Sequence, residues 1–267
     1  MKKFILEPTL SLLAAINQCP PQMTEKDKVQ SLLNKLWPVS CDKELIRLGV
    51  LGDGGYLVPD DLDGIEACFS PGVGFDSAFE KDCADRGMKI FLADGSVDKP
   101  AQSHELFVFT KKYIGIRNSS NIITIDDWVK LSMPDSQGEL LLQMDIEGSE
   151  YEVLLVASDD LLKRFRIIVI EFHHLDELWS SAFFKMASQV FERILQTHTC
   201  VHNHPNNCSN SVKFKEIEIP TVIELTFLRN DRINNPSFVK NFPHPLDYDN
   251  TKNKPSLHLP KCWYSNK

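Results

Sequence analysis

The fold class is decided by the stretch Ile65-Glu66-Ala67-Cys68-Phe69-Ser70-Pro71-Gly72-Val73-Gly74-Phe75-Asp76. An apolar run of strand length leads here into a turn that holds two glycines. Glycine lets the backbone approach a ligand closely, and the free amides at the start of a helix attract polar or anionic groups. A strand, a glycine turn and a helix in this order predict a loop that cradles a cofactor. The plainer alternative is a turn that needs its glycines for backbone reasons alone.

Four further apolar runs of similar length follow along the chain, and helical patterns alternate with them. Runs that are apolar on successive residues suit strands buried on both faces, as parallel strands beneath crossover helices are. We therefore predict an α/β protein with a doubly wound, mostly parallel, Rossmann-like sheet. The five runs cover residues 65–69, 89–93, 106–109, 140–144 and 167–172.

Helix starts and a terminal hairpin complete this pattern. Residues 77–80 and 149–152 match the capping box, in which a serine hydroxyl accepts from a first-turn amide and a glutamate bonds back. Helices are thus predicted to begin just after the first and fourth strands, and a further helix spans residues 181–196. Residues 199–202 and 221–228 then alternate as hairpin strands do, which predicts a C-terminal antiparallel pair at the sheet edge.

The domain organisation is simple, because no internal repeat and no linker divides the chain. We expect one domain over residues 1–267. Residues 1–60 form an N-terminal helical extension together with an opening motif. Residues 234–267 are rich in Asn, Pro and Lys without periodicity, which predicts an irregular tail on the surface.

Composition excludes several classes of function. Of the 267 residues, 42% are hydrophobic and 25% are charged, as in ordinary soluble globular proteins. Lys and Arg number 29 against 37 Asp and Glu, and the resulting net charge of −8 argues against a nucleic-acid partner. No stretch approaches the roughly 18 to 20 apolar residues that a membrane span needs.

The cysteines and the N-terminus bear on the compartment. The cysteines are odd in number, scattered and without a CxxC pair, which predicts free thiols in a reducing compartment. They are Cys19, Cys41, Cys68, Cys83, Cys200, Cys208 and Cys262. Residues 1–17 imitate a signal peptide, but Glu7 and Pro8 interrupt the apolar run, so we expect a short amphipathic helix. The predicted location is cytoplasmic.

Two details of the glycine loop decide the expected cofactor. A dinucleotide fingerprint needs a third glycine three residues after Gly74, and Ser77 stands there, which disfavours NAD. Asp94 ends the second strand, where a carboxylate can accept from both ribose hydroxyls of NAD or of S-adenosylmethionine. The alternative for Asp94 is a simple turn aspartate before Gly95.

Acidic residues follow the fourth strand at its carboxyl end. Asp145 and Glu147 stand directly after residues 140–144. Open α/β sheets bind ligands in the crevice beside the carboxyl ends of the strands, where the strand order reverses. These acids therefore lie where a ligand is expected.

The fifth strand ends in further polar residues, Glu171, His173 and His174, beside Asp145. A histidine there suits a general base, because its ordinary pKa lies near neutrality. Each histidine alone could equally be a hydrogen-bonded surface residue, and only one of two neighbours easily points into the crevice. Asp145, Glu171 and His173 are also ligand types for a divalent ion. We expect that no metal binds. If a metal ion does bind, we expect these three residues to be its ligands.

One segment carries a resemblance to a known family. Residues 143–154, Gln-Met-Asp-Ile-Glu-Gly-Ser-Glu-Tyr-Glu-Val-Leu, resemble the hallmark of the FkbM-type methyltransferases, an Asp-x-Glu-Gly-x-Glu stretch followed by Val-Leu. The glycine loop departs from the pattern, because Ser70-Pro71 stand where methyltransferases often place an acid. Further stretches similar to family motifs are residues 47–49 with 53–56, 125–128, 170–173, 202–208, 219–220 and 224–227.

The resemblance implies a class I, S-adenosylmethionine-dependent methyltransferase fold. It also implies methylation of a hydroxyl on a sugar, glycan or related metabolite, so that the partner is a small-molecule or glycan acceptor. The residues expected to contact the cofactor are Gly72, Gly74, Phe75, Asp76, Asp94, Asp126 and Asp145.

For the chemistry we predict His173 as the base, supported by Glu171, with Asp145 placing the acceptor or the sulfonium. The alternative bases are His174, His202 and His204. Two competing functions are an NAD-linked oxidoreductase on the same type of sheet and a catalytically silent binding domain. The missing third glycine argues against the first, and the retained acids with His173 argue against the second.

Overall fold

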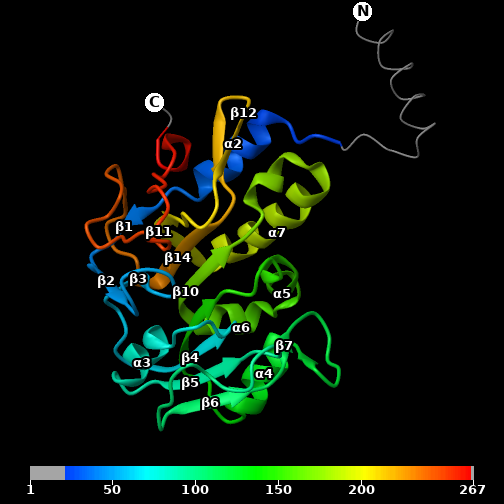
Figure 1. Ribbon diagram of the computed structural model, residues 1–267, viewed down its shortest axis with the longest axis vertical. Coiled ribbons are helices and arrows are strands. Elements are labelled where there is room, and N and C mark those ends of the chain that lie inside the picture. The colour runs from blue at the N-terminus through cyan, green and yellow to red at the C-terminus, as the bar shows by residue number, and fades with distance from the viewer. Residues whose placement is uncertain (1–21, 266–267) are drawn as a thin grey trace, which may run out of the picture.

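A seven-stranded sheet runs through the protein, shown in Figure 1 as a computed structural model that describes residues 22–265. The helix predicted within residues 1–17 lies outside this range. The strand order is β11-β14-β10-β9-β4-β5-β6. These strands are β4 (Ile65–Pro71), β5 (Lys89–Ala93), β6 (Phe107–Thr110), β9 (Glu139–Met144), β10 (Phe165–Phe172), β11 (His198–Pro205) and β14 (Ile223–Arg229).

The predicted α/β class and the doubly wound, mostly parallel sheet are confirmed. All five apolar runs form strands, and β4, β5, β6, β9 and β10 are parallel to their neighbours among these five. The predicted antiparallel pair is also present, but β14 inserts between β10 and β11 and is antiparallel to both. The strand order reverses at β4, which has β5 on one side and β9 on the other. The carboxyl ends of β4 and β9 are therefore the expected position of a ligand crevice.

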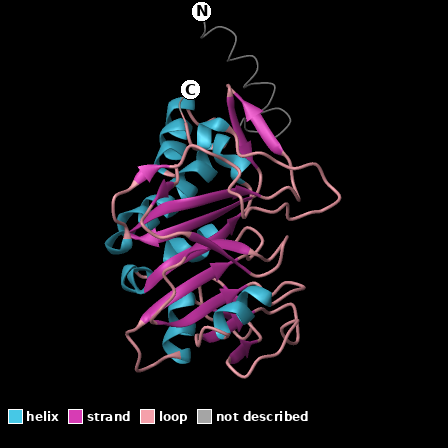
Figure 2. Cartoon of the chain, turned by 90° about the vertical axis from the view of Figure 1, so that its left-hand side faces the viewer, coloured by secondary structure: helices cyan, strands magenta, loops and turns pink. Residues whose placement is uncertain are grey.

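The two faces of the sheet are covered unequally. One face packs against α2, α4, α5, α6 and α7, and their apolar side chains form the larger core. The other face packs against α3 and a short hairpin, which form a second core. Figure 1 shows these layers on opposite sides of the sheet, and Figure 2 shows its strands stacked along the long axis. The helices are α2 (Lys26–Lys35), α3 (Ala78–Ala84), α4 (Ile125–Ser132), α5 (Glu150–Val156), α6 (Asp159–Arg164) and α7 (Ser181–Thr197), with 3-10 turns η1 (Leu175–Trp179), η2 (Asn230–Arg232) and η3 (Lys261–Trp263).

Two helices begin where the sequence predicts, but their capping boxes do not form. α3 and α5 start directly after Ser77 and Ser149, yet neither hydroxyl accepts a capping hydrogen bond. Glu80 instead turns into the sheet, where its carboxyl lies 2.6 Å from the hydroxyl of Ser70. Glu150 accepts from two amides of the loop that precedes α5. The capping prediction was wrong because Ser77 and Ser149 have ψ values of 30° and 0° and lack the extended backbone of a serine that caps a helix.

The segments at either end of the chain add short strands. After α2 the N-terminal part continues as β1 (Val39–Ser40) and the hairpin of β2 (Leu45–Leu48) and β3 (Tyr56–Pro59), so it is only partly the predicted helical extension. From residue 234 onward the described elements are β15 (Ser237–Phe238), which pairs with β1, and η3. A single domain over the whole chain stays a prediction.

Two short strand pairs lie in the loops between the strands of the main sheet. β7 (Tyr113–Ile114) and β8 (Ile122–Ile123) pair in parallel after β6. β12 (Ser211–Phe214) and β13 (Ile217–Pro220) form an antiparallel hairpin between β11 and β14, where the sequence indicates only a polar connection.

The cysteines of the described residues are unpaired, which agrees with the prediction of free thiols. Cys19 lies outside these residues. Within residues 22–265 no helix combines the length and the apolar character needed to cross a membrane.

Candidate active site

A cavity of about 470 Å³ opens at the carboxyl ends of β4, β5 and β9. Gly72 and Asp94 line one side, Asp145 and Glu147 line another, and residues 113–116 add a largely apolar wall. The cavity lies where the strand order reverses, as the rule for open α/β sheets predicts. Its volume is within the range of small-molecule sites, about 300 to 1,000 Å³.

The two glycines of the loop have different structural roles. Gly72 has φ +89°, and a Cβ at this position would lie 1.6 Å from the carbonyl oxygen of Asp145. Its amide donates to the carbonyl of Ala93, and the carbonyl of Pro71 accepts from the amide of Asp145. Gly72 therefore joins the ends of β4, β5 and β9. A Cβ on Gly74 would meet no atom within 4 Å, so this glycine faces open space.

Asp94 is held by hydrogen-bond donors on both carboxylate oxygens. Oδ2 accepts from the amide of Val73 at 3.0 Å, and Oδ1 accepts from the amide and the hydroxyl of Ser96, each at 2.6 Å. Burial by itself would raise the pKa of Asp94, but these hydrogen bonds lower it below its ordinary value. The three donors leave acceptor capacity on Oδ2, so a charged and oriented carboxylate lines the cavity.

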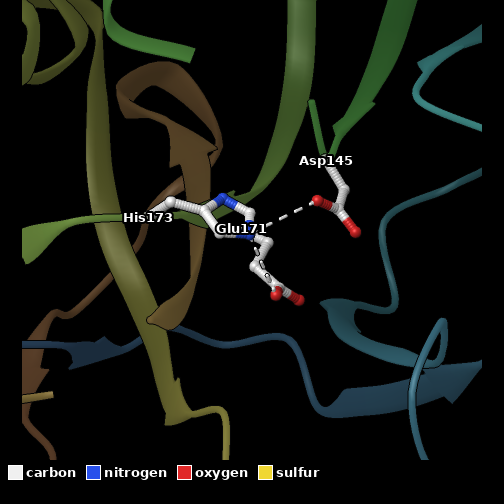
Figure 3. Close-up of side chains that lie close together, drawn as sticks. All are labelled: Asp145, Glu171 and His173. Carbon is white, nitrogen blue, oxygen red and sulfur yellow. Dashed lines mark ion pairs between the residues drawn. The ribbon is translucent and has the colours of Figure 1, made fainter. Parts of the chain in front are cut away.

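Asp145, Glu171 and His173 converge at the carboxyl ends of β9 and β10, and we refer to them as the trio (Figure 3). The Nε2 of His173 lies 3.9 Å from Oδ1 of Asp145 and 3.6 Å from Oε1 of Glu171. The exposed Glu147 places a third carboxylate 3.6 Å from the same nitrogen. These distances exceed hydrogen-bond length, so the groups surround a small space without bonding to one another.

The imidazole of His173 is oriented from behind by Glu150. Oε1 of this fully buried glutamate lies 3.2 Å from Nδ1 of His173 and accepts from the amides of Ile146 and Gly148. With a carboxylate on its Nδ1 side, a neutral imidazole carries its hydrogen there. The Nε2 lone pair then faces the carboxylates of the trio.

Burial and like charges shift the titration of the trio. Burial raises the pKa of Asp145 to about 7, with repulsion from Glu147 and Glu150 adding to the rise and His173 opposing it. Burial likewise raises the pKa of Glu171 well above its ordinary value. Burial opposes a charge on His173, but Glu150 and the other carboxylates raise the pKa of this histidine overall. The cluster thus has more carboxyl groups than its single imidazole can balance, so its buried acids favour a proton or a cation.

Glu171 is the least satisfied member of the trio. Its side chain is 5% exposed, and its Oε1 accepts from the side-chain amide (Nδ2) of Asn206 at 3.0 Å. Its Oε2 is buried and has no hydrogen-bond partner, and the same holds for Oδ1 of Asp145. Buried carboxylate oxygens normally have partners, so these two oxygens need an explanation.

Besides Gly74, which does not line the cavity either, three further residues predicted to contact the cofactor lie elsewhere. Phe75 is fully exposed, and Oδ1 of Asp76 accepts from the amide of Ala78. Asp126 accepts from the amide and the hydroxyl of Ser158, which ties α4 to α6. None of the three lines the cavity, although Phe75 and Asp76 belong to its glycine loop. Their cofactor roles stay predictions. The hydrogen bonds from Ser158 give Asp126 a structural role between α4 and α6.

The alternative histidines are separated from the trio's centre. His174 has φ +59° and precedes η1, with its ring beside Gly148. His202 and His204 lie buried on β11, where their ring nitrogens lie 2.9 and 3.6 Å from Oδ1 of Asp247, a residue of the tail. His173 is the histidine that the fold brings to Asp145.

Sequence reasoning missed several residues of the site. Glu150 orients His173, although its sequence pattern is that of a helix start. Asn206 donates to Glu171, although its sequence pattern is that of a polar loop. Asp53, in the opening motif, contributes a charge that helps raise the pKa of both Asp145 and Glu171. The opening-motif hairpin therefore lies beside the trio, a position that only its resemblance to a family motif could have suggested.

The reversed strand order, the crevice and the acidic strand ends define a Rossmann-like α/β protein with a ligand site at the carboxyl ends of its strands. The model of the "Methyltransferase FkbM domain" matches residues 45–198, and the chain belongs to this family. No curated protein matches the chain. Among solved structures, "a putative RNA methyltransferase PH1948 from Pyrococcus horikoshii" is similar, with 13% identity, a TM-score of 0.33, and coverage of 77% of this chain and 99% of that chain. This likeness is too weak to bear on the substrate.

Proposed function

We propose that this methyltransferase transfers the methyl group of S-adenosylmethionine to a hydroxyl of a sugar, glycan or related small metabolite. The family to which the chain belongs generally uses this cofactor. The proposal is carried by one observation: Asp145 lines the cavity and is also a member of the trio. A methyl donor in the cavity would therefore present its reactive group beside residues that can receive a proton.

The residues of the cavity suit the cofactor on two counts. Asp94 retains acceptor capacity for ribose hydroxyls, and its donors hold it charged and oriented. The wall of Ile114, Ile116 and Ile122 offers an apolar surface for a flat purine ring. When bound, the cofactor supplies an electrophilic methyl group on a sulfonium.

The transfer places a clear demand on the protein. The bond between the methyl carbon and sulfur breaks, and its electrons stay on sulfur. The methyl carbon forms a new bond to the hydroxyl oxygen, which loses its proton. A neutral sugar hydroxyl has a pKa far above 7, so a positioned base typically contributes about 10² to 10⁴ in rate. Asp145 lines the cavity, and the Nε2 of His173 lies 3.9 Å from its Oδ1, so these two groups are the proposed acceptors of that proton. Positioning supplies the remainder of the rate.

The charge of the site supports a neutral acceptor. Within residues 22–265, the ion pairs of Asp145, Glu147, Glu150 and Glu171 all involve His173, and no lysine or arginine pairs with them. Such a surface repels phosphate groups and accepts hydrogen bonds from hydroxyls. This favours a sugar over a nucleic acid, in line with the net charge of −8.

A direct assay tests the proposal. The protein is incubated with S-adenosylmethionine that carries an isotope-labelled methyl group, together with neutral sugars, glycans and RNA, and the products are analysed by mass spectrometry. We expect a labelled methyl ether on a sugar hydroxyl, and calorimetry that shows binding of S-adenosylhomocysteine but not of NAD. Label in RNA alone would overturn the acceptor class, and binding without transfer to any acceptor would favour the silent binding domain.

A further inference from the structure

We propose that Asp145, Glu171 and His173 form a binding site for a divalent first-row transition-metal ion. The sequence alone favours no metal at this position. The structure changes the balance, because it shows how the three side chains and their surroundings are arranged (Figure 3). The site stands on this geometry, and only its role toward an acceptor rests on the proposed function.

The spacing of the ligand atoms fits an ion. One ligand atom from each residue lies within 4.8 Å of the others, and His173 Nε2 is 3.6 and 3.9 Å from its carboxylate neighbours. With metal to ligand distances of about 2.1 Å, neighbouring ligands stand roughly 3.0 to 3.4 Å apart. Shifts of less than about 1 Å would therefore close the site around an ion.

An independent observation points to a ligand in the same space. Glu171 is a buried residue, and its Oε2 has no hydrogen-bond partner. Oδ1 of Asp145 is likewise buried without a hydrogen-bond partner. A buried carboxylate oxygen without a donor is costly, and a cation between these oxygens removes that cost.

The support behind His173 has the form found behind metal-binding histidines. Glu150 binds Nδ1 at 3.2 Å and is itself fixed by two backbone amides. Metal-ligating imidazoles usually donate their other N–H to such a carboxylate, which fixes the ring and turns the free lone pair to the ion. In the absence of a cation, that lone pair would face Asp145 and Glu171 directly.

A buried acid on the adjacent strand lacks the unpartnered buried oxygen that Glu171 has. Glu224 pairs in register with Glu171 across β10 and β14, and it is also buried. Its Oε1 accepts from Asn250 at 2.6 Å, and the charge of His204 opposes the rise of its pKa. Glu171 has the side-chain amide of Asn206 on Oε1 and His173 at 3.6 Å, yet its buried Oε2 has no hydrogen-bond partner.

The donor set selects the class of metal. Two carboxylates and one imidazole suit Mn²⁺, Fe²⁺, Co²⁺ or Zn²⁺ better than Ca²⁺, which prefers an all-oxygen site. Such an ion lowers the pKa of a coordinated hydroxyl, which is the demand that O-methylation makes.

Binding of Mn²⁺ alone tests the site. Protein freed of metal with a chelator is titrated with Mn²⁺, and free Mn²⁺ is followed by electron paramagnetic resonance. We expect one saturable site, with affinity reduced at least about tenfold in Glu171→Gln, His173→Ala and Asp145→Asn, and about 10- to 100-fold in Glu150→Gln as a positioning residue. His258→Ala, a change at an exposed histidine of the tail, should bind as the parent does.

The outcomes separate this inference from the proposed function. No saturable binding up to about 1 mM Mn²⁺, or equal affinity in the parent and in Glu171→Gln, overturns the metal site. If a thermal melt shows that Glu171→Gln does not fold, Asp145→Asn decides in its place. Binding of S-adenosylhomocysteine without Mn²⁺ binding leaves the methyltransferase proposal standing, and Mn²⁺ binding without methyl transfer leaves only the metal site.

Discussion

Asp94 and Glu171 are carboxylates at the same edge of the sheet, and their surroundings are opposite. Asp94 follows β5 and receives three hydrogen bonds, which lower its pKa. Glu171 lies near the end of β10 and receives one, and burial raises its pKa well above the ordinary value. The β5 side of the crevice thus has a fixed charge, whereas Glu171 on the β10 side needs a proton or a cation to balance its buried carboxylate.

The difference indicates a division of labour along one crevice. A satisfied carboxylate orients a neutral ligand, because its charge does not change when the ligand binds. An unsatisfied buried carboxylate changes its protonation, or binds a cation, as part of its task. We therefore expect changes on the β5 side to affect cofactor affinity and changes on the β10 side to affect turnover.

The largest effect is expected at Gly72, which joins the two sides. Gly72→Ala places a Cβ against the carbonyl oxygen of Asp145 and strains a backbone with φ +89°. We expect a loss of about 4 kcal/mol or more in the free energy of unfolding, measured by urea denaturation. Gly74→Val is the matched control for stability, because a Cβ at Gly74 meets no atom within 4 Å. This variant should cost little stability but abolish cofactor binding. Equal stability of Gly72→Ala and the parent would contradict the described junction of β4 and β9.

His173→Ala should lower kcat by about 10² to 10⁴, because it removes a proton acceptor or metal ligand from the β10 side. The affinity for S-adenosylhomocysteine, measured by calorimetry, should remain close to that of the parent. His174→Ala provides the control at the neighbouring position. Full activity in His173→Ala would transfer the search for the base to His174, His202 or His204.

Asp94→Ala should weaken binding of S-adenosylhomocysteine by about 1.5 to 3 kcal/mol, the range for hydrogen bonds to a charged acceptor. Asp94→Asn should fall between the alanine variant and the parent. Once the cofactor is saturating, kcat should change little, in contrast to His173→Ala. Unchanged affinity in Asp94→Ala would remove this residue from the ribose site and with it the comparison of the two sides.

The last prediction concerns the pH dependence of stability at His204, which pairs in register with the buried Glu224 on the adjacent strand. Burial would lower the pKa of His204, but Asp247 and Glu224 raise it to about 9, with Arg47 opposing. A raised histidine pKa stabilises the folded state below the unfolded pKa of about 6.5, and this contribution is lost as the pH rises through about 9. We expect a decrease of up to about 3 kcal/mol in the free energy of unfolding over this interval. His204→Gln should flatten the dependence, and an unchanged slope in that variant would show that other groups cause it.

The sequence by itself determined the sheet and the position of the crevice. The strands over residues 65–69, 140–144 and 167–172 could be predicted because a continuous apolar run is a local signal that is recognised without knowledge of the pairing partners. The glycine loop and the acids after residue 144 were predictable for the same reason, since the carboxyl ends of parallel strands meet at one edge. The family segment at residues 143–154 then indicated the class of chemistry.

Tertiary structure decided what each side chain does at that edge. Glu150 has the pattern of a helix start, but it binds His173, 23 residues away, and Gly72 is a glycine because Asp145 crosses it. Glu171 differs from Asp94 through its deeper burial, the acids around it and the single donor that the fold brings to it. Charge state and hydrogen bonding depend on every group packed around a buried atom, and those groups come from strands far apart in the chain, so their effects appear only when the chain has folded.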